Sequence, residues 1–64
     1  MDTEAQAQRR ADLERLIQQA GGTHAAARDL GVNPSTIWRW RHARREIGNP
    51  VHKLIVSLHK LSPG

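Results

Sequence analysis

Apolar residues recur at intervals of three and four along most of the 64-residue chain, in blocks separated by glycine or proline. This spacing places side chains on one face of an α-helix. It predicts helices at approximately 4–20, 24–30, 34–45 and 50–61, and the first begins either at the cap residue Thr3 or nearer Arg10. We therefore expect one compact all-α domain of four or five helices that spans residues 1–64.

Each predicted helix has a face expected to point inward. The first contributes Leu13, Leu16, Ile17 and Ala20, and the last contributes Val51, Leu54, Ile55, Leu58 and Leu61. Between them lie Ala26, Leu30, Val32, Ile37 and Trp40, and Ile47 is expected to pack beneath a loop. Together these residues form the predicted core.

The stretch from Thr23 to His42 predicts two short helices joined by a tight turn. Thr23 is a suitable N-cap, and Gly31 can adopt the left-handed conformation that closes a helix. Asn33 can cap the next helix, and Pro34 suits its first position because that N–H is unpaired anyway. The two helices must cross steeply, so a small side chain is needed where they touch, and Ala27 supplies it. This is the pattern of a helix-turn-helix that binds DNA.

The second helix of this pair has a distinct outer face. Ser35, Trp38, Arg39 and His42 follow one another at i, i+3, i+4 and i+7, opposite Ile37, Trp40 and the stem of Arg44. Arginine can bridge two acceptors of guanine, and apolar groups can contact thymine methyls in the major groove. These four residues are the predicted base-reading set. The alternative is an ordinary solvated helix face.

Several segments resemble the helix-turn-helix of the lambda-repressor-like superfamily, and most closely small phage regulators of the Cro and CII types. They are Gly22 to Leu30, Gly31-Val32-Asn33, Ser35-Thr36-Ile37 and Trp38-Arg39-Trp40, and the resemblance covers about Leu13 to Leu58. It implies a lambda-repressor-like fold, and contacts to the DNA backbone from Thr23, His24, Asn33 and Thr36. For His24, the alternative is a surface histidine without a role. The chain differs from many relatives at Thr23-His24, where a glutamine is common, and at the bulky Trp38.

The formal net charge of +4 is concentrated in the same region. Residues 1–22 carry a net −1, residues 23–45 a net +4, and residues 46–64 a net +1. A basic patch of this kind attracts polyanions. Arg41, Arg44 and Arg45 extend it beyond the base-reading turns, so we expect them to contact phosphates. Arg28 is either a further phosphate contact or merely solvated.

The chain lacks the residues that other classes of function would require. The chain has no cysteine, and its six carboxylates are scattered without a nucleophile and base, so we expect neither an enzyme nor a cofactor. His52 and His59 are seven apart and lack further ligands for zinc, so no metal is expected. No apolar run approaches the roughly 20 residues of a membrane span, which favours a cytoplasmic protein.

A chain of this length buries a small core, so self-association is expected. The flank of the last predicted helix is the candidate dimer surface, and it consists of His52, Ile55, Val56 and His59. A twofold dimer would read an inverted repeat of double-stranded DNA.

The leading hypothesis is therefore a homodimeric, sequence-specific transcription repressor from a phage or mobile element. A CII-like activator, which would also contact RNA polymerase, and an antitoxin-like regulator remain open within the same class. The rival from another class is a helical protein-interaction module, which an exposed Trp38 would favour.

Overall fold

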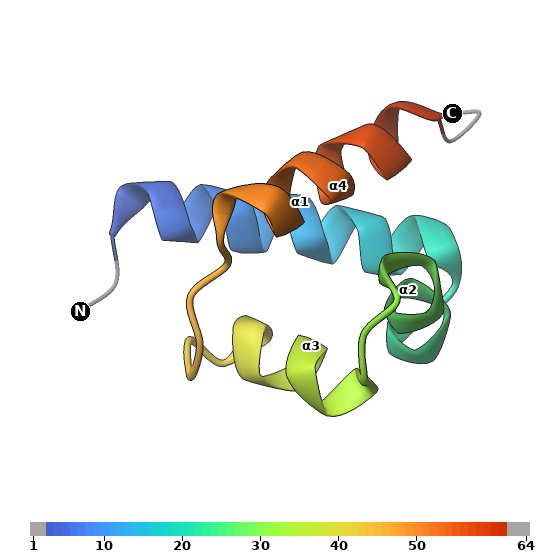
Figure 1. The fold of residues 1–64 in the computed structure, drawn as a ribbon, viewed down its shortest axis with the longest axis horizontal. Coiled ribbons are helices and arrows are strands. Elements are labelled where there is room, and N and C mark those ends of the chain that lie inside the picture. Colours follow the sequence, from blue (N-terminus) through green and yellow to red (C-terminus); the bar gives the residue numbers. More distant parts are fainter. Residues whose placement is uncertain (1–2, 62–64) are drawn as a thin grey trace.

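The computed structural model describes residues 3–61, with side chains for residues 3–59. This part of the chain contains four helices: α1 (Glu4–Ala20), α2 (Thr23–Leu30), α3 (Pro34–Arg41) and α4 (Asn49–Leu61) (Figure 1). The predicted all-α fold is confirmed. The expected inward position of the Leu61 side chain falls outside the described side chains.

Helix α1 is the element against which the rest of the domain packs. It contacts α2, α3 and α4, and α4 runs along its upper side in Figure 1. Helices α2 and α3 lie on the lower side, joined by the short turn at residues 31–33. The two surfaces expected to bind partners, α3 and the flank of α4, therefore lie on different sides of the domain.

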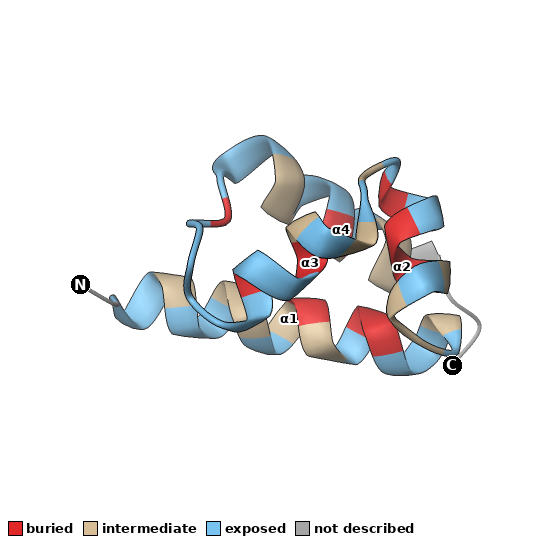
Figure 2. Ribbon diagram, turned by 90° about the horizontal axis from the view of Figure 1, so that it is seen from below, coloured by how far each residue is buried: buried red, intermediate tan, exposed pale blue. Residues whose placement is uncertain are grey.

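The core forms where the four helices face one another (Figure 2). Its buried residues are Leu13, Leu16, Ile17, Ala26, Ala27, Leu30, Ile37, Trp40, Ile47 and Ile55, with Ala20, Val32, Val51 and Leu58 packed against them. Among the described side chains, the predicted inward faces are confirmed with one exception. Leu54 of α4 is 41% exposed.

The starts of the first two helices differ in how well the sequence predicted them. Thr3 caps α1, its hydroxyl accepting a hydrogen bond from the Gln6 N–H at 3.1 Å, so the start at Thr3 is confirmed. For α2 the predicted N-cap was wrong. Gly22 occupies that position without a side-chain hydrogen bond, and Thr23 is already the first helical residue.

The turn between α2 and α3 has the predicted construction. Gly31 has a φ of 72°, and the N–H groups of Gly31 and Val32 donate to the carbonyls of Arg28 and Ala27. This pair of bonds closes the helix as a Schellman motif. Asn33 then accepts a bond from the Ser35 N–H at 3.0 Å, and Pro34 follows as the first residue of α3.

Helix α3 ends at Arg41, so the predicted end near Arg45 was wrong. The chain leaves the helix through Ala43, which has a φ of 56°. The N–H of Ala43 donates to the Trp40 carbonyl, and the N–H of Arg44 donates to the Arg39 carbonyl at 2.7 Å. These bonds form another Schellman motif, with alanine where glycine is usual. Arg44 and Arg45 consequently lie in a loop.

Candidate nucleic-acid interface

The outer face of α3 is exposed along its length. Ser35, Trp38 and Arg39 are exposed, whereas Ile37 and Trp40, which alternate with them, are buried. Trp38 is 52% exposed, so an indole ring lies open to solvent at the middle of this helix. Because the buried residues fix the rotation of α3, a partner approaching from outside meets Ser35, Trp38 and Arg39 first.

His42 is the fourth predicted base-reading residue, and it lies at the end of α3 instead of within it. It is exposed, and its ring stacks on that of Trp38 with centroids 4.3 Å apart and planes inclined by 35°. The two rings therefore form one aromatic surface on the outer face.

The loop after α3 turns its arginines toward this aromatic surface. Trp38, Arg39, Arg44 and Arg45 line an open hollow of about 560 Å³. All four side chains are exposed. The expectation that the Arg44 stem shares the buried face of Ile37 and Trp40 was wrong, because the helix ends before it. The hollow combines three guanidinium groups with an indole face, which is a suitable chemistry for phosphate and base contacts.

Arg41 has a partner within the domain. Its guanidinium Nε donates to the Glu14 carboxylate of α1, and both side chains are about 40% exposed. The ion pair links α1 to the end of α3. Arg41 does not line the hollow, whose loop arginines are Arg44 and Arg45.

The remaining predicted backbone contacts lie near the starts of α2 and α3. His24 and Asn33 are exposed, whereas Thr23 and Thr36 are half-buried. The start of α2 has no side-chain cap, and a helix N-terminus of this kind favours an anion. Asn33 Oδ1 accepts from both the N–H and the hydroxyl of Ser35, at 3.0 and 2.9 Å, so these two residues hold each other in place.

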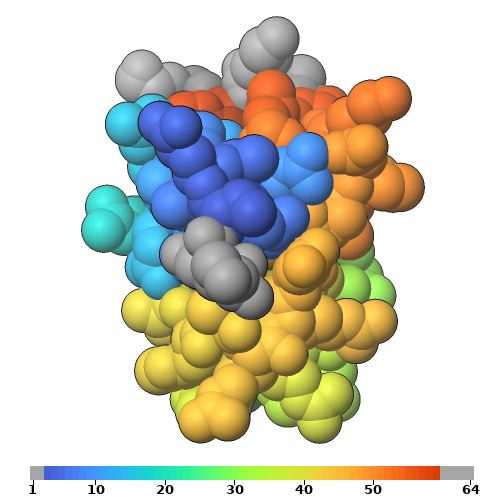
Figure 3. Space-filling model, turned by 90° about the vertical axis from the view of Figure 1, so that its left-hand side faces the viewer, coloured from blue at the N-terminus to red at the C-terminus, as the bar shows by residue number. Residues whose placement is uncertain are grey.

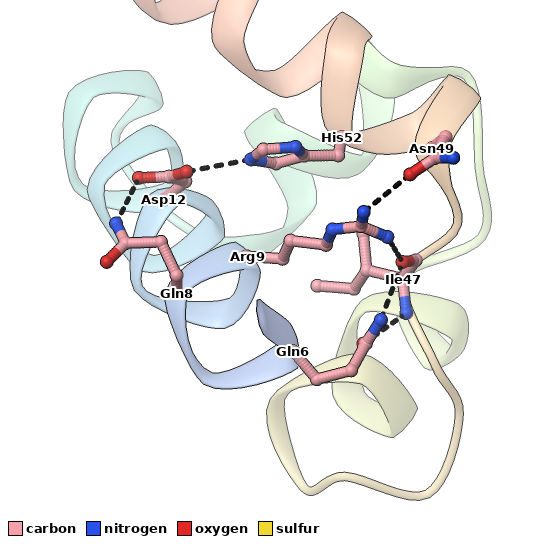
Figure 4. A network of polar contacts seen from close by, with 7 residues as sticks. All are labelled: Gln6, Gln8, Arg9, Asp12, Ile47, Asn49 and His52. Carbon is pink, nitrogen blue, oxygen red and sulfur yellow. Dashed lines mark hydrogen bonds and ion pairs between the residues drawn. The ribbon is translucent and has the colours of Figure 1, made fainter. Parts of the chain in front are cut away.

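A polar network at the start of α1 was missed from the sequence (Figure 4). Gln6 forms two hydrogen bonds with the backbone of Ile47, donating to its carbonyl at 3.0 Å and accepting from its N–H at 2.8 Å. Arg9 donates to the same carbonyl at 2.7 Å and to the Asn49 side chain. Gln6 and Arg9 extend the apolar face of Leu13 by three- and four-residue steps, and this spacing was the available signal.

The predicted dimer surface on α4 requires one correction. Ile55 is 0% exposed in the chain's own core, so it is unavailable to a second copy. Val56 is half-buried and borders two hollows, one lined also by Asp12, Arg15 and His59 and the other by His52, Lys53 and Ser57. Val56 and its two flanking histidines remain the candidate surface.

Both of these histidines have partners on α1. His52 Nε2 lies 2.8 Å from Asp12 Oδ2, and His59 Nε2 lies 3.2 Å from the Gln19 amide. The bond from His52 lowers the pKa of the Asp12 carboxyl below its usual 3.8. The contact between Asp12 and His52 therefore joins α1 to α4.

Two further features are absent from the described part of the chain. No group of three or more histidine, cysteine or acidic side chains within residues 3–59 is placed to hold a metal ion. Among the helices between residues 3 and 61, none has the length and apolar character needed to cross a membrane.

Comparison with known proteins identifies the family. A family model described as a homeodomain-like domain matches residues 4–49, which comprise α1, α2, α3 and the loop that follows. The chain therefore belongs to this helix-turn-helix family of DNA-binding domains. The match supports the predicted helix-turn-helix but not the narrower lambda-repressor, Cro or CII assignment. No curated protein and no solved structure matches the chain.

Proposed function

We propose that the protein is a sequence-specific regulator of transcription that acts as a homodimeric repressor, as do the Cro-type phage regulators that its sequence resembles. The observation that carries this proposal is the exposed outer face of α3, with Ser35, Trp38 and Arg39 beside the two loop arginines. It is a binding role, in the cytoplasm of a bacterial host, and it requires no cofactor.

In the proposed complex α3 lies in the major groove. Homeodomain-type helix-turn-helix domains place their third helix there. Ser35, Trp38 and Arg39 would then contact base edges, with His42 at the end of the helix. Arg44 and Arg45 would reach one flanking strand, and the uncapped start of α2 with Thr23 and His24 would reach the other. Asn33 and Thr36 complete the proposed backbone contacts.

The dimer surface is proposed on α4, around Val56 with His52 and His59. Val56 lines both hollows of this flank, and α4 lies on the opposite side of α1 from α3 (Figure 1). A twofold dimer would place two copies of α3 about 34 Å apart on an inverted repeat. Val56→Asp should then weaken binding to a palindromic site while leaving binding to a single half-site unchanged.

Selection of bound sequences from random duplex DNA tests the proposal most directly. An enriched inverted repeat, with half-sites about one helical turn apart, is the expected result. Enrichment of a single unpaired half-site would contradict the dimer. The absence of any enriched sequence, with binding that disappears at moderate salt, would contradict sequence-specific regulation.

Two other functions share the same features. An activator would use the same DNA contacts and additionally bind RNA polymerase, so transcription from a promoter beside the selected site distinguishes it from a repressor. A protein-interaction module, as in an antitoxin, is favoured by the 52% exposure of Trp38. That function predicts retention of a protein partner at a salt concentration that removes all nucleic acid.

A further inference from the structure

The loop that carries Arg44 and Arg45 contains one anchoring side chain. Of residues 42–48, Ile47 alone is buried, and the others are exposed (Figure 2). The loop also passes through Ala43 in a left-handed conformation that an alanine adopts at a cost. Beyond the buried Ile47 side chain, the position of this loop therefore depends on backbone hydrogen bonds and on contacts from other elements.

The start of α1 supplies that support. Gln6 pairs with both the N–H and the C=O of Ile47, as a neighbouring β-strand would, and Arg9 bonds the same carbonyl and the Asn49 side chain. These contacts join residues about 40 positions apart, and they fix the far end of the loop just before α4 begins. Figure 3 shows the loop, in yellow and gold, directly below the first turns of α1, in blue.

The other end of the loop is fixed by the Schellman motif at Ala43, which directs Arg44 back toward α3. With both ends held, Arg44 and Arg45 stay beside Trp38 and Arg39 in the hollow. Gln6 itself does not line that hollow.

We propose that Gln6 and Arg9 are positioning residues for DNA binding, which hold the α3–α4 loop so that Arg44 and Arg45 meet the DNA backbone. The effect on DNA binding rests on the proposed function. The positioning of the loop rests on the hydrogen bonds alone. When only a fraction of the molecules has the competent loop, the apparent Kd rises by the inverse of that fraction.

The variant Gln6→Ala tests the proposal because it removes both bonds to Ile47, changes no charge, and favours the helix. Gln8→Ala is the matched control, since Gln8 lies on the same helix and, among the described residues, its side chain bonds only to Asp12. We expect Gln6→Ala to weaken binding to duplex DNA roughly three- to tenfold at low salt, and Gln8→Ala to leave it unchanged. Both affinities are measured well below the unfolding temperature of each variant.

A double-mutant cycle separates positioning from a general structural role. In a background of Arg44→Ala with Arg45→Ala, the loss caused by Gln6→Ala should vanish, because the loop no longer contributes contacts. An equal loss in both backgrounds, or no loss in the wild-type background, would overturn the proposal. Arg9→Lys provides a second variant if Gln6→Ala does not fold. It keeps the charge, but a single ammonium cannot reproduce the two-pronged contact of the guanidinium.

Amide hydrogen exchange tests the positioning without DNA. The Ile47 amide should exchange faster in Gln6→Ala than in the wild type or in Gln8→Ala, while amides in the α2 and α1 core keep their protection. Unchanged exchange at Ile47 would overturn the positioning role by itself. A wild-type protein that fails to bind duplex DNA would instead overturn the proposed function, so the two failures are distinguishable.

Discussion

The rings of Trp38 and His42 stack with their centroids 4.3 Å apart, on the outer face of α3 and at its end. The stack is exposed, since Trp38 retains 52% of its accessible surface and His42 is exposed as well. A stack in water contributes little to folding, because most of its apolar area stays hydrated. The stack therefore presents an aromatic surface to solvent on the outer face of α3.

Replacing each of the two tryptophans by alanine should therefore have very different effects on the unfolding free energy. Trp38→Ala should cost at most about 1 kcal/mol of unfolding free energy, because its ring is half exposed. It should still weaken DNA binding, because the aromatic surface is lost. Trp40→Ala should cost about 3–5 kcal/mol, because the 4%-exposed ring fills the core. Thermal unfolding and duplex binding check the pair, and a larger destabilisation by Trp38→Ala would contradict this assignment.

The residues with left-handed backbone at the helix ends predict a second pair of substitutions with opposite effects on stability. Ala43→Gly should stabilise the domain by roughly 0.5–1 kcal/mol, because it removes the strain of an alanine at a φ of 56°. Gly31→Ala should destabilise it by about 1 kcal/mol. Its added Cβ meets no atom within 4 Å, so the cost arises from the φ of 72°.

Gly48→Ala is the control for these two substitutions. Gly48 does not have a positive φ, and its added Cβ would meet the Pro50 ring at an ordinary 3.7 Å. We expect it to be neutral or slightly stabilising. Chemical unfolding of the three variants measures the differences. Equal destabilisation by Gly31→Ala and Gly48→Ala would show that backbone conformation is not the cause.

These helix ends also show what the sequence could predict. The turn at Gly31, Asn33 and Pro34 was predictable because each residue acts locally, through its own backbone preference. The end of α3 was not, because the stop occurs at an alanine in a run of good helix formers.

The contacts at the site likewise divide into those set by local sequence and those set by tertiary packing. The exposed face of α3 followed from periodicity, because Ile37 and Trp40 had to be buried. The pairs Arg41–Glu14, His52–Asp12 and Gln6–Ile47 join residues 27 to 41 positions apart, and no local pattern specifies which polar side chains meet. Tertiary packing decides these partners, and they include the ones proposed to hold the loop.

The loop arginines should differ from Arg41 in their effect on DNA. Arg44→Ala and Arg45→Ala should each weaken binding to all sequences alike, and each should lower the slope of log K against log salt by roughly 1. Arg41→Ala should have a smaller effect, because Glu14 already balances its charge. Salt titrations with specific and random duplexes measure both quantities. A loss confined to one base position would mean that the residue reads sequence.

The Asp12–His52 pair predicts a change in acid stability. The folded pKa of Asp12 lies below the usual 3.8, so the unfolded chain binds more protons as the pH falls through this range. The stabilisation from this carboxyl is therefore complete above about pH 4 to 5 and is lost as the pH falls through the folded pKa. Asp12→Asn should cost about 1 kcal/mol at pH 5 to 6 and nothing under strongly acidic conditions.

Unfolding measured across this pH range checks the linkage, with Asp29→Asn as the control because Asp29 is an exposed carboxylate on α2. The control should not share the pH-dependent loss. If the cost of Asp12→Asn were the same at every pH, the ionised carboxylate would not be the stabilising group.

Base readout by Arg39 is the sharpest test of the interface. Arg39 is exposed on α3, next to Trp38 and four residues after Ser35, and its guanidinium can bond both major-groove acceptors of guanine. Arg39→Ala should cost about 1–3 kcal/mol on the selected site and relax the preference for guanine at one position in each half-site. Arg39→Lys should restore charge, and with it non-specific binding, but only part of the specificity. Binding to a panel of single-base variants of the site distinguishes these effects. If Arg39→Ala keeps the wild-type preference at every position, then Arg39 contacts only the backbone, and base readout must come from Trp38 or His42.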